Sequence, residues 1–463
     1  MDPQKLARIT LLDTDTLRHT MERFIETAIF TGGSGFALVV DPQGRCVGVI
    51  TDGDVRRALV TQSNVDAPVS TAMNRDFRHS RQGDSAHTVL RLFDTRVKRV
   101  PVLDADDRLV DVLHYEDFTA AARNEKRIIR ARAPVRVSFG GGGSDTSYSI
   151  RSKTGFVLSS TINKYAYATI LVRADDRIRI VSRDYRQEVE AESVQALRYD
   201  GQLDLIKACA RLMDPGFGFD IETYSEVEPG TGLGGSSAMA VAVIGALNHF
   251  RHENHLDRYH IADLAYQAER IELNIAGGWQ DQYASAFGGL STIEFREDEI
   301  VVFPMKLQQD LLLELRANLL IFRVGERRSS GQIHHEQRRR FTESDSALAA
   351  HYATLVRQAQ AMREAIAKGN LRKFGELLHE GWQTKKALSA GISNPVVDAM
   401  YEAAREHGAV GGKLLGAGGG GYLMLYSSPS HHVGIIDRLG AMGARYETFD
   451  FVDTGLQTWT TRR

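Results

Sequence analysis

The stretch Glu228-Pro-Gly-Thr-Gly-Leu-Gly-Gly-Ser-Ser-Ala-Met239 lies between a strand-like apolar segment and a helix-like segment, Val241–Leu247. Its proline ends a strand ladder because it has no N–H to donate. The glycines permit a tight loop, and the start of a helix directs several N–H groups toward one point. Such a loop is typical of a phosphate site. The candidate phosphate-binding residues are Pro229, Gly230, Gly232, Leu233, Gly234, Gly235, Ser236 and Ser237.

Two other phosphate motifs fit this stretch less well. Its glycines match the dinucleotide pattern G-x-G-x-x-G, but that pattern needs a second strand ending in an acidic residue about twenty positions later. The sequence from His249 to His260 is instead polar and rich in histidine. Gly412-Lys413-Leu414 lacks the hydroxyl of a Walker A loop. A glycine-rich turn without a ligand remains the alternative for this stretch taken alone.

Composition limits the class of protein. The 463 residues suggest about three domain-sized units. Hydrophobic residues make up 43% and charged residues 25%, as in an ordinary soluble protein, and the net charge of −2 favours neither nucleic acid nor an anionic membrane. Cys46 and Cys209 are far apart, which argues against a disulfide scaffold or a zinc site. With no signal-peptide core and no apolar run of membrane length, we expect a cytoplasmic protein.

The N-terminal part, 1–123, contains an internal repeat. Phe36–Asp54 and Val100–Asp117 each predict a strand, an acidic turn, a strand and a capped helix. Because one such strand pair is too small to form a core, we expect the two copies to pack together. This arrangement resembles a tandem of cystathionine-β-synthase-type (CBS) modules, which bind adenosine ligands.

The resemblance to CBS modules includes a short motif. Thr-x-x-Asp after the second strand, in which the acid binds ribose hydroxyls, is matched by Thr51 and Asp54. In the second copy His114 replaces the threonine while Asp117 remains. The resemblance implies a regulatory adenine nucleotide at Thr51, Asp54 and Asp117. The alternative is that both aspartates only cap helices, as aspartate commonly does.

The second part begins after a charged stretch, 124–132, that we expect to be a linker. Ala133–Phe139 predicts a strand, and four glycines then lead to Asp145. Such glycines are typical of a tight turn that places a carboxylate next to exposed backbone. Apolar segments at 155–162 and 165–172 predict two further strands of a β-rich lobe.

A helix is predicted over Ile261–Glu272. Its apolar stripe consists of Ile261, Leu264, Ala265, Ala268 and Ile271. Glu269 borders this stripe, where a solvated charge is the more common outcome. The next segment, Gly277–Gly289, contains Asp281 among glycines and aromatic residues, and partial burial of that aspartate would favour a functional role.

The C-terminal part is expected to be mainly helical to about Glu406, with a loop over Leu388–Pro395. Gly411–Tyr426 then predicts a glycine-rich turn that leads into a strand. Because Gly408–Gly421 is too apolar for a flexible linker, we expect its backbone to approach another loop closely.

Three glycine-rich segments in this order resemble the motifs of the GHMP sugar and metabolite kinases. The matching segments are Ala133–Arg136 with Gly140–Asp145, then Pro229–Ala238, then Lys413–Gly421. Within that family the motifs are most similar to those of the D-glycero-D-manno-heptose 7-phosphate kinases, as Gly278-Trp-Gln-Asp-Gln282 and Gly391-Ile-Ser-Asn-Pro395 indicate. The resemblance implies an α+β protein: a CBS pair followed by a two-lobed kinase, with an ATP-binding lobe at 133–310 and a C-terminal lobe at 311–463.

The resemblance also implies roles for individual residues. Asp281 matches the catalytic acid, and Arg136 matches the cation of the first motif, which would keep Asp281 ionised and stabilise the transferring group. Ser237 and Glu269 match the ligands of Mg²⁺. The expected sugar-binding residues are Gly142, Gly143, Ser144, Asp145, Gly418 and Gly419.

The acceptor's own phosphate needs a second anion site. Arg328, in the segment Gly325–Gly331 ahead of a predicted helix, is a candidate because arginine binds phosphate through two parallel hydrogen bonds. The alternative is an ordinary surface arginine at a helix start.

These observations predict an ATP- and Mg²⁺-dependent sugar kinase with an N-terminal regulatory domain. The preferred reaction phosphorylates the anomeric hydroxyl of D-glycero-D-manno-heptose 7-phosphate and gives the 1,7-bisphosphate, a precursor of nucleotide-activated heptose. A kinase for a fucose- or galactose-like sugar and a non-catalytic adenine-nucleotide sensor are the alternatives. A homodimer is an expectation from the resemblance only.

Overall fold

The computed structural model describes residues 3–27, 35–62, 64–94, 97–115, 128–150, 154–173, 175–228, 230–250, 255–325 and 346–461. The chain forms two compact units, Met1–Lys126 and Arg127–Arg463, which are described one at a time. The predictions for Asp117, Pro229 and Arg328 fall outside the described residues.

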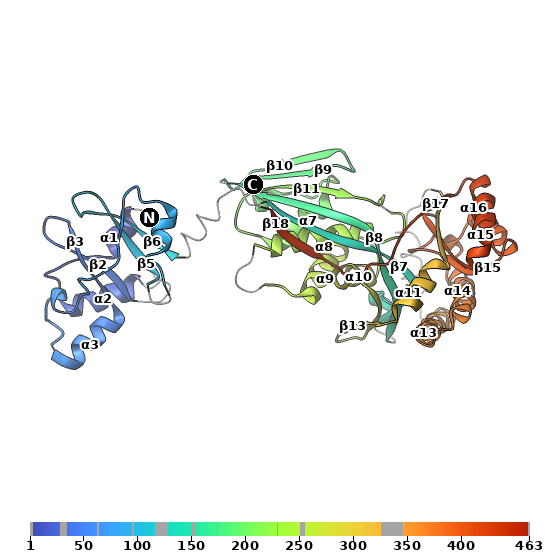
Figure 1. Ribbon diagram of the computed structural model, residues 1–463, viewed down its shortest axis with the longest axis horizontal. Helices are drawn as coiled ribbons and strands as arrows, with labels where there is room; N and C mark the ends of the chain where they lie inside the picture. The colour runs from blue at the N-terminus through green and yellow to red at the C-terminus, as the bar shows by residue number, and fades with distance from the viewer. Residues whose placement is uncertain are drawn as a thin grey trace. The chain divides into compact units, whose positions relative to one another are not determined.

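The N-terminal unit contains two small three-stranded sheets, β1-β2-β3 and β4-β5-β6, with helices packed beside them (Figure 1). Its elements are α1 (Pro3–Arg8), β1 (Thr10–Leu12), α2 (Leu17–Thr27), β2 (Phe36–Val40), β3 (Cys46–Thr51), α3 (Asp52–Gln62), η1 (Val69–Thr71), β4 (Ser80–Arg81), α4 (Ala86–Leu90), β5 (Arg99–Leu103) and β6 (Leu109–His114).

The internal repeat is present in this unit as two matching hairpins. In the first, Asp41 closes the β2–β3 turn by accepting the N–H groups of Gln43 and Arg45 at 3.0 and 2.9 Å. In the second, Asp104 closes the β5–β6 turn in the same way by accepting the N–H groups of Asp106 and Arg108. One buried cluster joins side chains of both hairpins: Ile9, Phe36, Leu38, Cys46, Leu103 and Val112. The expected packing of the two copies is confirmed.

The C-terminal unit begins with a large mixed sheet and the helices that cover it. These elements are β7 (Ile128–Gly140), α6 (Ser147–Ile150), β8 (Gly155–Val172), β9 (Ile178–Ser182), β10 (Gln187–Ala191), η2 (Val194–Ala196), α7 (Asp204–Met213), β11 (Phe219–Ser225), α8 (Gly235–Asn248), α9 (Arg258–Tyr266), the π-helix η3 (Gln267–Glu272), α10 (Gln280–Phe287), β12 (Leu290–Phe295) and β13 (Ile300–Pro304).

The rest of the C-terminal unit is richer in helix. It consists of α11 (Gln309–Ala317), β14 (Leu319–Arg323), α13 (Ser346–Ala367), α14 (Leu371–Lys386), η4 (Ala390–Ile392), α15 (Pro395–Glu406), β15 (Ala409–Leu414), β16 (Tyr422–Ser427), η5 (Pro429–His431), α16 (His432–Ala441), β17 (Arg445–Glu447) and β18 (Gln457–Thr461).

The large sheet has the strand order β10-β9-β11-β8-β12-β13, and β7 pairs with β8 on one side and β18 on the other. Two expectations are wrong here. Residues 155–172 form one strand, β8, instead of two, because Asn163 and Lys164 are bound by Asp450 and Glu447 from the distant C-terminal segment. Residues 128–132 are not linker, because they pair with β18 as the first part of β7.

A four-stranded sheet, β15-β16-β14-β17, forms the core of the C-terminal lobe together with α15 and α16. The last strand, β18, pairs with β7 of the large sheet. Residues 457–461, which were expected in the C-terminal lobe, are therefore part of the large sheet.

Helix α8 lies against the large sheet and packs against β7, β8 and α10 (Figure 1). Every side chain from Ser237 to Asn248 is buried, as expected for a helix that is apolar on all sides. Its first residue is Gly235, so the glycine loop leads directly into its N-terminus. None of the described helices is both long and apolar enough to cross a membrane.

Candidate active site

The glycine loop before α8 has the backbone conformation that only glycine adopts easily. Gly230, Gly232 and Gly234 have φ angles of 75°, 91° and 78°. The first N–H groups of α8 have no partner within the helix, and the positive end of its dipole lies at the same place. The loop and the start of α8 therefore have the geometry that an anion site requires.

A second glycine-rich loop, between β15 and β16, supports the first by close backbone contact. A Cβ on Gly416 would lie 2.6 Å from the Cα of Gly232, and a Cβ on Gly421 would lie 2.2 Å from the carbonyl oxygen of Thr231. Neither position has room for a side chain. The expected approach of this segment to another loop is therefore present.

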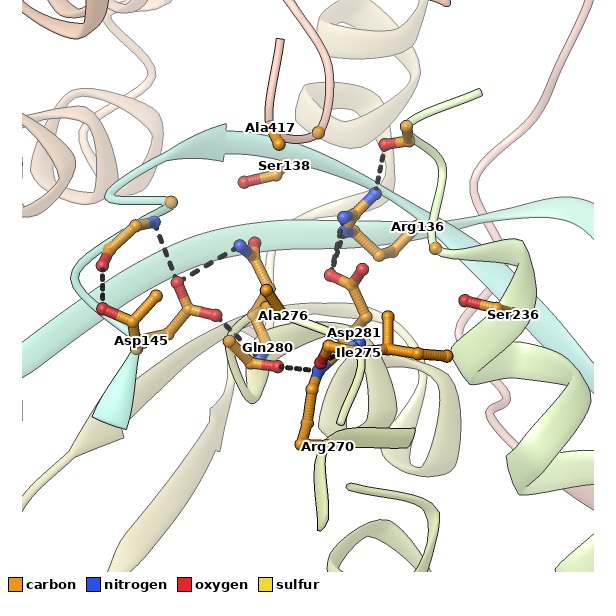
Figure 2. Close-up of a pocket in the computed structure, with 18 of the residues that line it drawn as sticks. Arg136, Ser138, Asp145, Ser236, Arg270, Ile275, Ala276, Gln280, Asp281 and Ala417 are labelled. Carbon is orange, nitrogen blue, oxygen red and sulfur yellow. Dashed lines mark hydrogen bonds and ion pairs between the residues drawn. The ribbon is translucent and has the colours of Figure 1, made fainter. Parts of the chain in front are cut away.

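Arg136, on β7, connects the glycine loop to Asp281. Its Nε and Nη2 contact Asp281 Oδ1 at 2.9 and 2.6 Å, and its Nη1 donates to the carbonyl of Gly232 at 2.7 Å (Figure 2). Arg136 is 3% exposed and the side chain of Asp281 is 20% exposed. Asp281 is the second residue of α10, where the helix start also favours a negative charge. The carboxylate is thus fixed in direction while its side chain stays partly exposed.

Asp145 is the second carboxylate of the site. It is 1% exposed and accepts hydrogen bonds from the N–H groups of Gly143 at 2.8 Å and Gln280 at 3.0 Å. Burial raises the pKa of this carboxyl, and the charge of Asp281 adds to the rise, while the hydrogen bonds act in the opposite direction.

These groups share a cavity of about 260 Å³. Its wall combines the glycine loop, the pair Arg136 and Asp281, the turn with Asp145, and residues from the C-terminal lobe (Figure 2). The predicted residues among its lining are Arg136, Gly142, Gly143, Asp145, Gly230, Gly232, Gly234, Gly235, Ser236 and Asp281. The structure therefore brings together segments that are almost 150 residues apart: Arg136 and Asp281 are separated by 145 positions.

Several lining residues were not identified from the sequence: Ser138, Arg270, Gln280, Lys385 and Leu388. Ser138 Oγ and Gln280 Oε1 are buried, and neither atom has a hydrogen-bond partner among the described residues. Buried polar atoms without a partner are uncommon in native proteins. The position of Ser138, two residues after the first-motif arginine on an inward-facing strand, was the signal available in the sequence.

Glu269 lies behind the glycine loop and is completely buried. It accepts hydrogen bonds from Ser236 at 2.7 Å and Ser237 at 2.6 Å, and also from the amide of Gln282. The solvated alternative for this residue is wrong. The wider π-turn of η3 shifts the helical phase, so Glu269 faces inward and Ile271, expected in the apolar stripe, is 66% exposed.

Some predicted sugar-binding residues do not line the cavity. The hydroxyl of Ser144 is bonded to the backbone of Gly141 and Phe156. Gly418 packs against Ile392, and the N–H of Gly419 donates to the carbonyl of Ile392 at 3.0 Å. Gly416 and Ala417 line the cavity in their place.

A second cavity of about 230 Å³ adjoins the glycine loop on its other side. Gly235 and Ser236 line both cavities. The remaining wall includes apolar and aromatic residues such as Tyr185, Leu203 and Met239. The sequence did not indicate this cavity, because its residues come from four separate segments without a shared motif.

In the N-terminal unit, Thr51 and Asp54 are in direct contact. Asp54 Oδ2 accepts hydrogen bonds from the N–H of Thr51 at 2.8 Å and from its hydroxyl at 2.5 Å. Asp54 is also paired with Arg57. The carboxylate therefore closes the start of α3, as the capping alternative requires, and its position is equally compatible with the ligand motif.

Comparison with protein-family models gives matches to three models over four segments. Residues 204–289 match the GHMP kinases N terminal domain, and residues 362–445 match the GHMP kinases C terminal domain. Residues 7–61 and 69–124 each match the CBS domain. A D-glycero-alpha-D-manno-heptose 7-phosphate kinase from Campylobacter jejuni is 32% identical over 339 residues, which cover 72% of this chain and 99% of that protein.

The chain belongs to the GHMP kinase family.

It is a phosphotransferase that acts on an alcohol group, and it carries a tandem of CBS domains at its N-terminus. A solved structure described as a D-glycero-D-manno-heptose 1-phosphate kinase from Bacteroides thetaiotaomicron is 30% identical, with a TM-score of 0.59 over 72% of this chain and 98% of that one. Lactococcus lactis galactokinase, at 18% identity and a TM-score of 0.60 over 75% of this chain and 98% of that one, shares the fold. The family uses ATP as its phosphate donor.

Proposed function

We propose that this GHMP kinase transfers the γ-phosphate of ATP to the anomeric hydroxyl of D-glycero-D-manno-heptose 7-phosphate and produces the 1,7-bisphosphate for nucleotide-activated heptose. The observation that carries the proposal is the single cavity in which the glycine loop, the Arg136–Asp281 pair and Asp145 meet. The name of the relative from C. jejuni, a heptose 7-phosphate kinase, supports this acceptor, and the name of the structure from B. thetaiotaomicron, a heptose 1-phosphate kinase, supports a heptose phosphate as the class of substrate.

The reaction assigns one role to each part of the cavity. Residues 230–237 bind the triphosphate, and the second cavity receives the nucleoside beyond it. Asp281 accepts the proton of the acceptor hydroxyl as that oxygen forms its bond to the γ-phosphorus. The bond from the γ-phosphorus to the β,γ-bridging oxygen breaks, and ADP leaves. Arg136 holds the carboxylate of Asp281 in this direction.

The acceptor binds on the Asp145 side of the cavity. We place the sugar hydroxyls next to Asp145, whose carboxylate accepts hydrogen bonds from them, and next to the backbone of Gly142 and Gly143. Ser138 Oγ and Gln280 Oε1, which have no partner among the described residues, are added to this set. A sugar hydroxyl that satisfied them would remove the free-energy cost of leaving them unpaired.

The residues around Glu269 fit a magnesium ion. Mg²⁺ prefers oxygen ligands and is usually bound by one or two carboxylates together with substrate phosphates. No group of three or more His, Cys, Asp or Glu side chains capable of holding a metal occurs in the described part of the chain. Glu269 and Ser237, with Ser236 closer to the cavity, would hold the ion beside the phosphates, where it neutralises their charge.

The N-terminal 123 residues are assigned a regulatory role, with an adenine nucleotide bound at Thr51 and Asp54. The contact between these two residues and the match to two CBS domains support this assignment. The kinase then occupies the chain from residue 128 onward.

The acceptor is tested by incubating the full-length protein with ATP, Mg²⁺ and a panel of sugars. The panel contains heptose 7-phosphate, free heptose, fucose and galactose, and product NMR identifies the carbon that is phosphorylated. We expect heptose 7-phosphate to give the largest kcat/KM and a product phosphorylated at C1. Preferential turnover of fucose or galactose, or phosphorylation at another carbon, would refute the proposed acceptor.

A further inference from the structure

Lys385, in the last turn of α14, brings a positive charge to the C-terminal wall of the cavity. It is largely buried and lines the cavity together with Leu388, Gly416 and Ala417. Its ammonium donates to the carbonyl oxygen of Gly416. Gly416 in turn lies against Gly232 of the glycine loop. The ammonium is therefore fixed beside the loop that binds phosphate.

Lys413, on β15, lies behind Lys385. It is 5% exposed, and its ammonium forms no hydrogen bond or ion pair with any residue that the structure describes. Burial lowers the pKa of Lys413 well below its usual range, and the charges of Lys385 and Arg136 lower it further. A buried ammonium next to two other cations is unfavourable unless an anion joins them.

Like Lys385, the other charged groups of the cavity have partners. Arg136 directs three nitrogens to Asp281 and to the carbonyl of Gly232. Asp145 accepts N–H groups of the backbone, and Arg270 faces Glu269 at 3.8 Å. Arg136 therefore has two of its five N–H groups left for a phosphate oxygen. Catalysis of phosphoryl transfer depends on cations placed at the equatorial oxygens of the transferring group.

We propose that Lys385, backed by Lys413, binds a phosphate group at this wall and that this group is the terminal phosphate of ATP during its transfer. The position beside Gly232 and Gly416, next to the Arg136–Asp281 pair, favours the transferring phosphate over the acceptor's own phosphate. A distal phosphate would lie several bonds from the oxygen that Asp281 activates. This proposal rests on the kinase assignment and does not require the acceptor to be a heptose.

The test compares Lys385→Met with Lys386→Met in the full-length protein. Lys386 is the next residue on the same helix, but it contacts Asp398 at 3.2 Å and does not line the cavity. Calorimetry measures the affinity for ADP and for a non-hydrolysable ATP mimic, each with Mg²⁺. In Lys385→Met we expect the mimic to bind about 10-fold more weakly and ADP to bind within about 2-fold of wild type, because only the mimic carries the third phosphate. Lys386→Met should change neither.

A kinetic arm identifies which phosphate is bound. With any accepted sugar, Lys385→Met should lower kcat about 100-fold, as loss of a charge-stabilising donor does, and Lys385→Arg should restore part of it. An unchanged ratio of mimic to ADP affinity would overturn the proposal. So would a loss confined to the KM of a phosphorylated acceptor, since the lysine would then bind the acceptor's phosphate. If Lys385→Met does not fold, Lys385→Arg and Lys413→Met are measured in the same way. Because the nucleotide arm uses no sugar, it gives a result even if heptose 7-phosphate is not the acceptor.

Discussion

Asp281 is the residue on which the proposed chemistry depends most directly. Its carboxylate is held by Arg136, and a Cβ on Gly234 would lie 3.3 Å from its Oδ2, so it is next to the loop that we propose binds the triphosphate. An amide in its place keeps the shape and one acceptor oxygen but does not accept a proton at neutral pH.

Asp281→Asn should therefore lower kcat by about 100- to 10,000-fold, the usual range for a general base, while the affinity for ATP stays close to wild type. Asp310→Asn is a matched control, because Asp310 also follows a glutamine in the first turn of a helix, α11, but is exposed. Turnover and calorimetry with ATP give the two quantities. Turnover near the wild-type rate in Asp281→Asn would remove Asp281 from its proposed role.

Glu269 is the second residue with a testable role. Glu269→Gln should lower the apparent affinity for Mg²⁺ about 10- to 100-fold, the loss typical of residues that organise a metal site. Glu272→Gln, an exposed residue of the same π-helix, is the control. The measurement is the Mg²⁺ concentration that gives half-maximal activity at saturating ATP. An identical Mg²⁺ dependence in both variants would exclude Glu269 as a ligand.

The lowered pKa of Lys413 predicts how the stability of the folded protein depends on pH. Its pKa is lowered in the folded protein, so the unfolded chain binds the additional proton and stability falls as pH decreases from the usual lysine range. The groups that face it are Lys385 and Arg136, both cationic. Lys413→Met should therefore raise the Tm of the free protein, with a gain that shrinks as pH rises toward 10.5, the usual pKa of lysine. Thermal unfolding at several pH values measures this, and a lower Tm for Lys413→Met at every pH would contradict it.

Some residues of the candidate site could be identified from the sequence, and others could not. Arg136, Asp145 and Asp281 could be identified because each belongs to a short motif with a recognisable spacing. The burial of Glu269 could not, because a regular helix over Ile261–Glu272 places it at the edge of the apolar stripe, and the π-turn that moves it inward leaves no simple pattern. Ser138 and Lys385 lie outside the motifs, so only the folded structure brings them to the cavity.

At the scale of elements, the two glycine-rich loops lie in close backbone contact, and we propose that together they support the triphosphate. Their contact leaves no space for a Cβ at Gly421, whose φ is 100°. Gly421→Ala should lower the free energy of unfolding by about 1–3 kcal/mol through strain and overpacking. Gly440→Ala, at a helical position of α16 with no atom within 4 Å of the new Cβ, should be neutral or stabilise by about 0.5–1 kcal/mol.

Chemical denaturation of both glycine variants measures these changes, and the KM for ATP should rise only in Gly421→Ala. Equal stabilities and equal KM values in the two variants would show that the loops do not depend on each other.

A helix or strand could be predicted from the sequence where the residues of that segment alone determine its structure. The glycine loop, α8 and the strand over Ala133–Phe139 all follow from residues within the segment. The continuous strand β8 does not, because its polar residues Asn163 and Lys164 are bound by residues almost 300 positions later in the chain. The sequence of 128–132 likewise predicts a linker, because the strand that pairs with it, β18, lies at the far end of the described chain.

At the scale of the whole molecule, a kinase is joined to a pair of CBS domains. If an adenine nucleotide binds at Thr51 and Asp54, the full-length protein should show a second class of nucleotide site in addition to the kinase site. Asp54→Ala should abolish this second class, because the carboxylate that contacts Thr51 is lost. Asp66→Ala, an exposed aspartate paired with Arg18, is the control.

Calorimetry with AMP, ADP and ATP on the full-length variants decides this, and turnover without added effector should stay within about 2-fold of wild type in both, because neither residue belongs to the kinase unit. Identical isotherms for wild type and Asp54→Ala would leave Asp54 as a helix cap only.

The central claim is that backbone N–H groups beginning near Gly230 bind the triphosphate and direct its end to Asp281. A crystal structure with Mg²⁺ and a non-hydrolysable ATP mimic tests it most directly. We expect the phosphates on residues 230–237, the nucleoside in the cavity lined by Tyr185 and Met239, and the terminal phosphorus facing Asp281. A mimic bound elsewhere in the kinase unit, with its terminal phosphate remote from Asp281, would contradict the account.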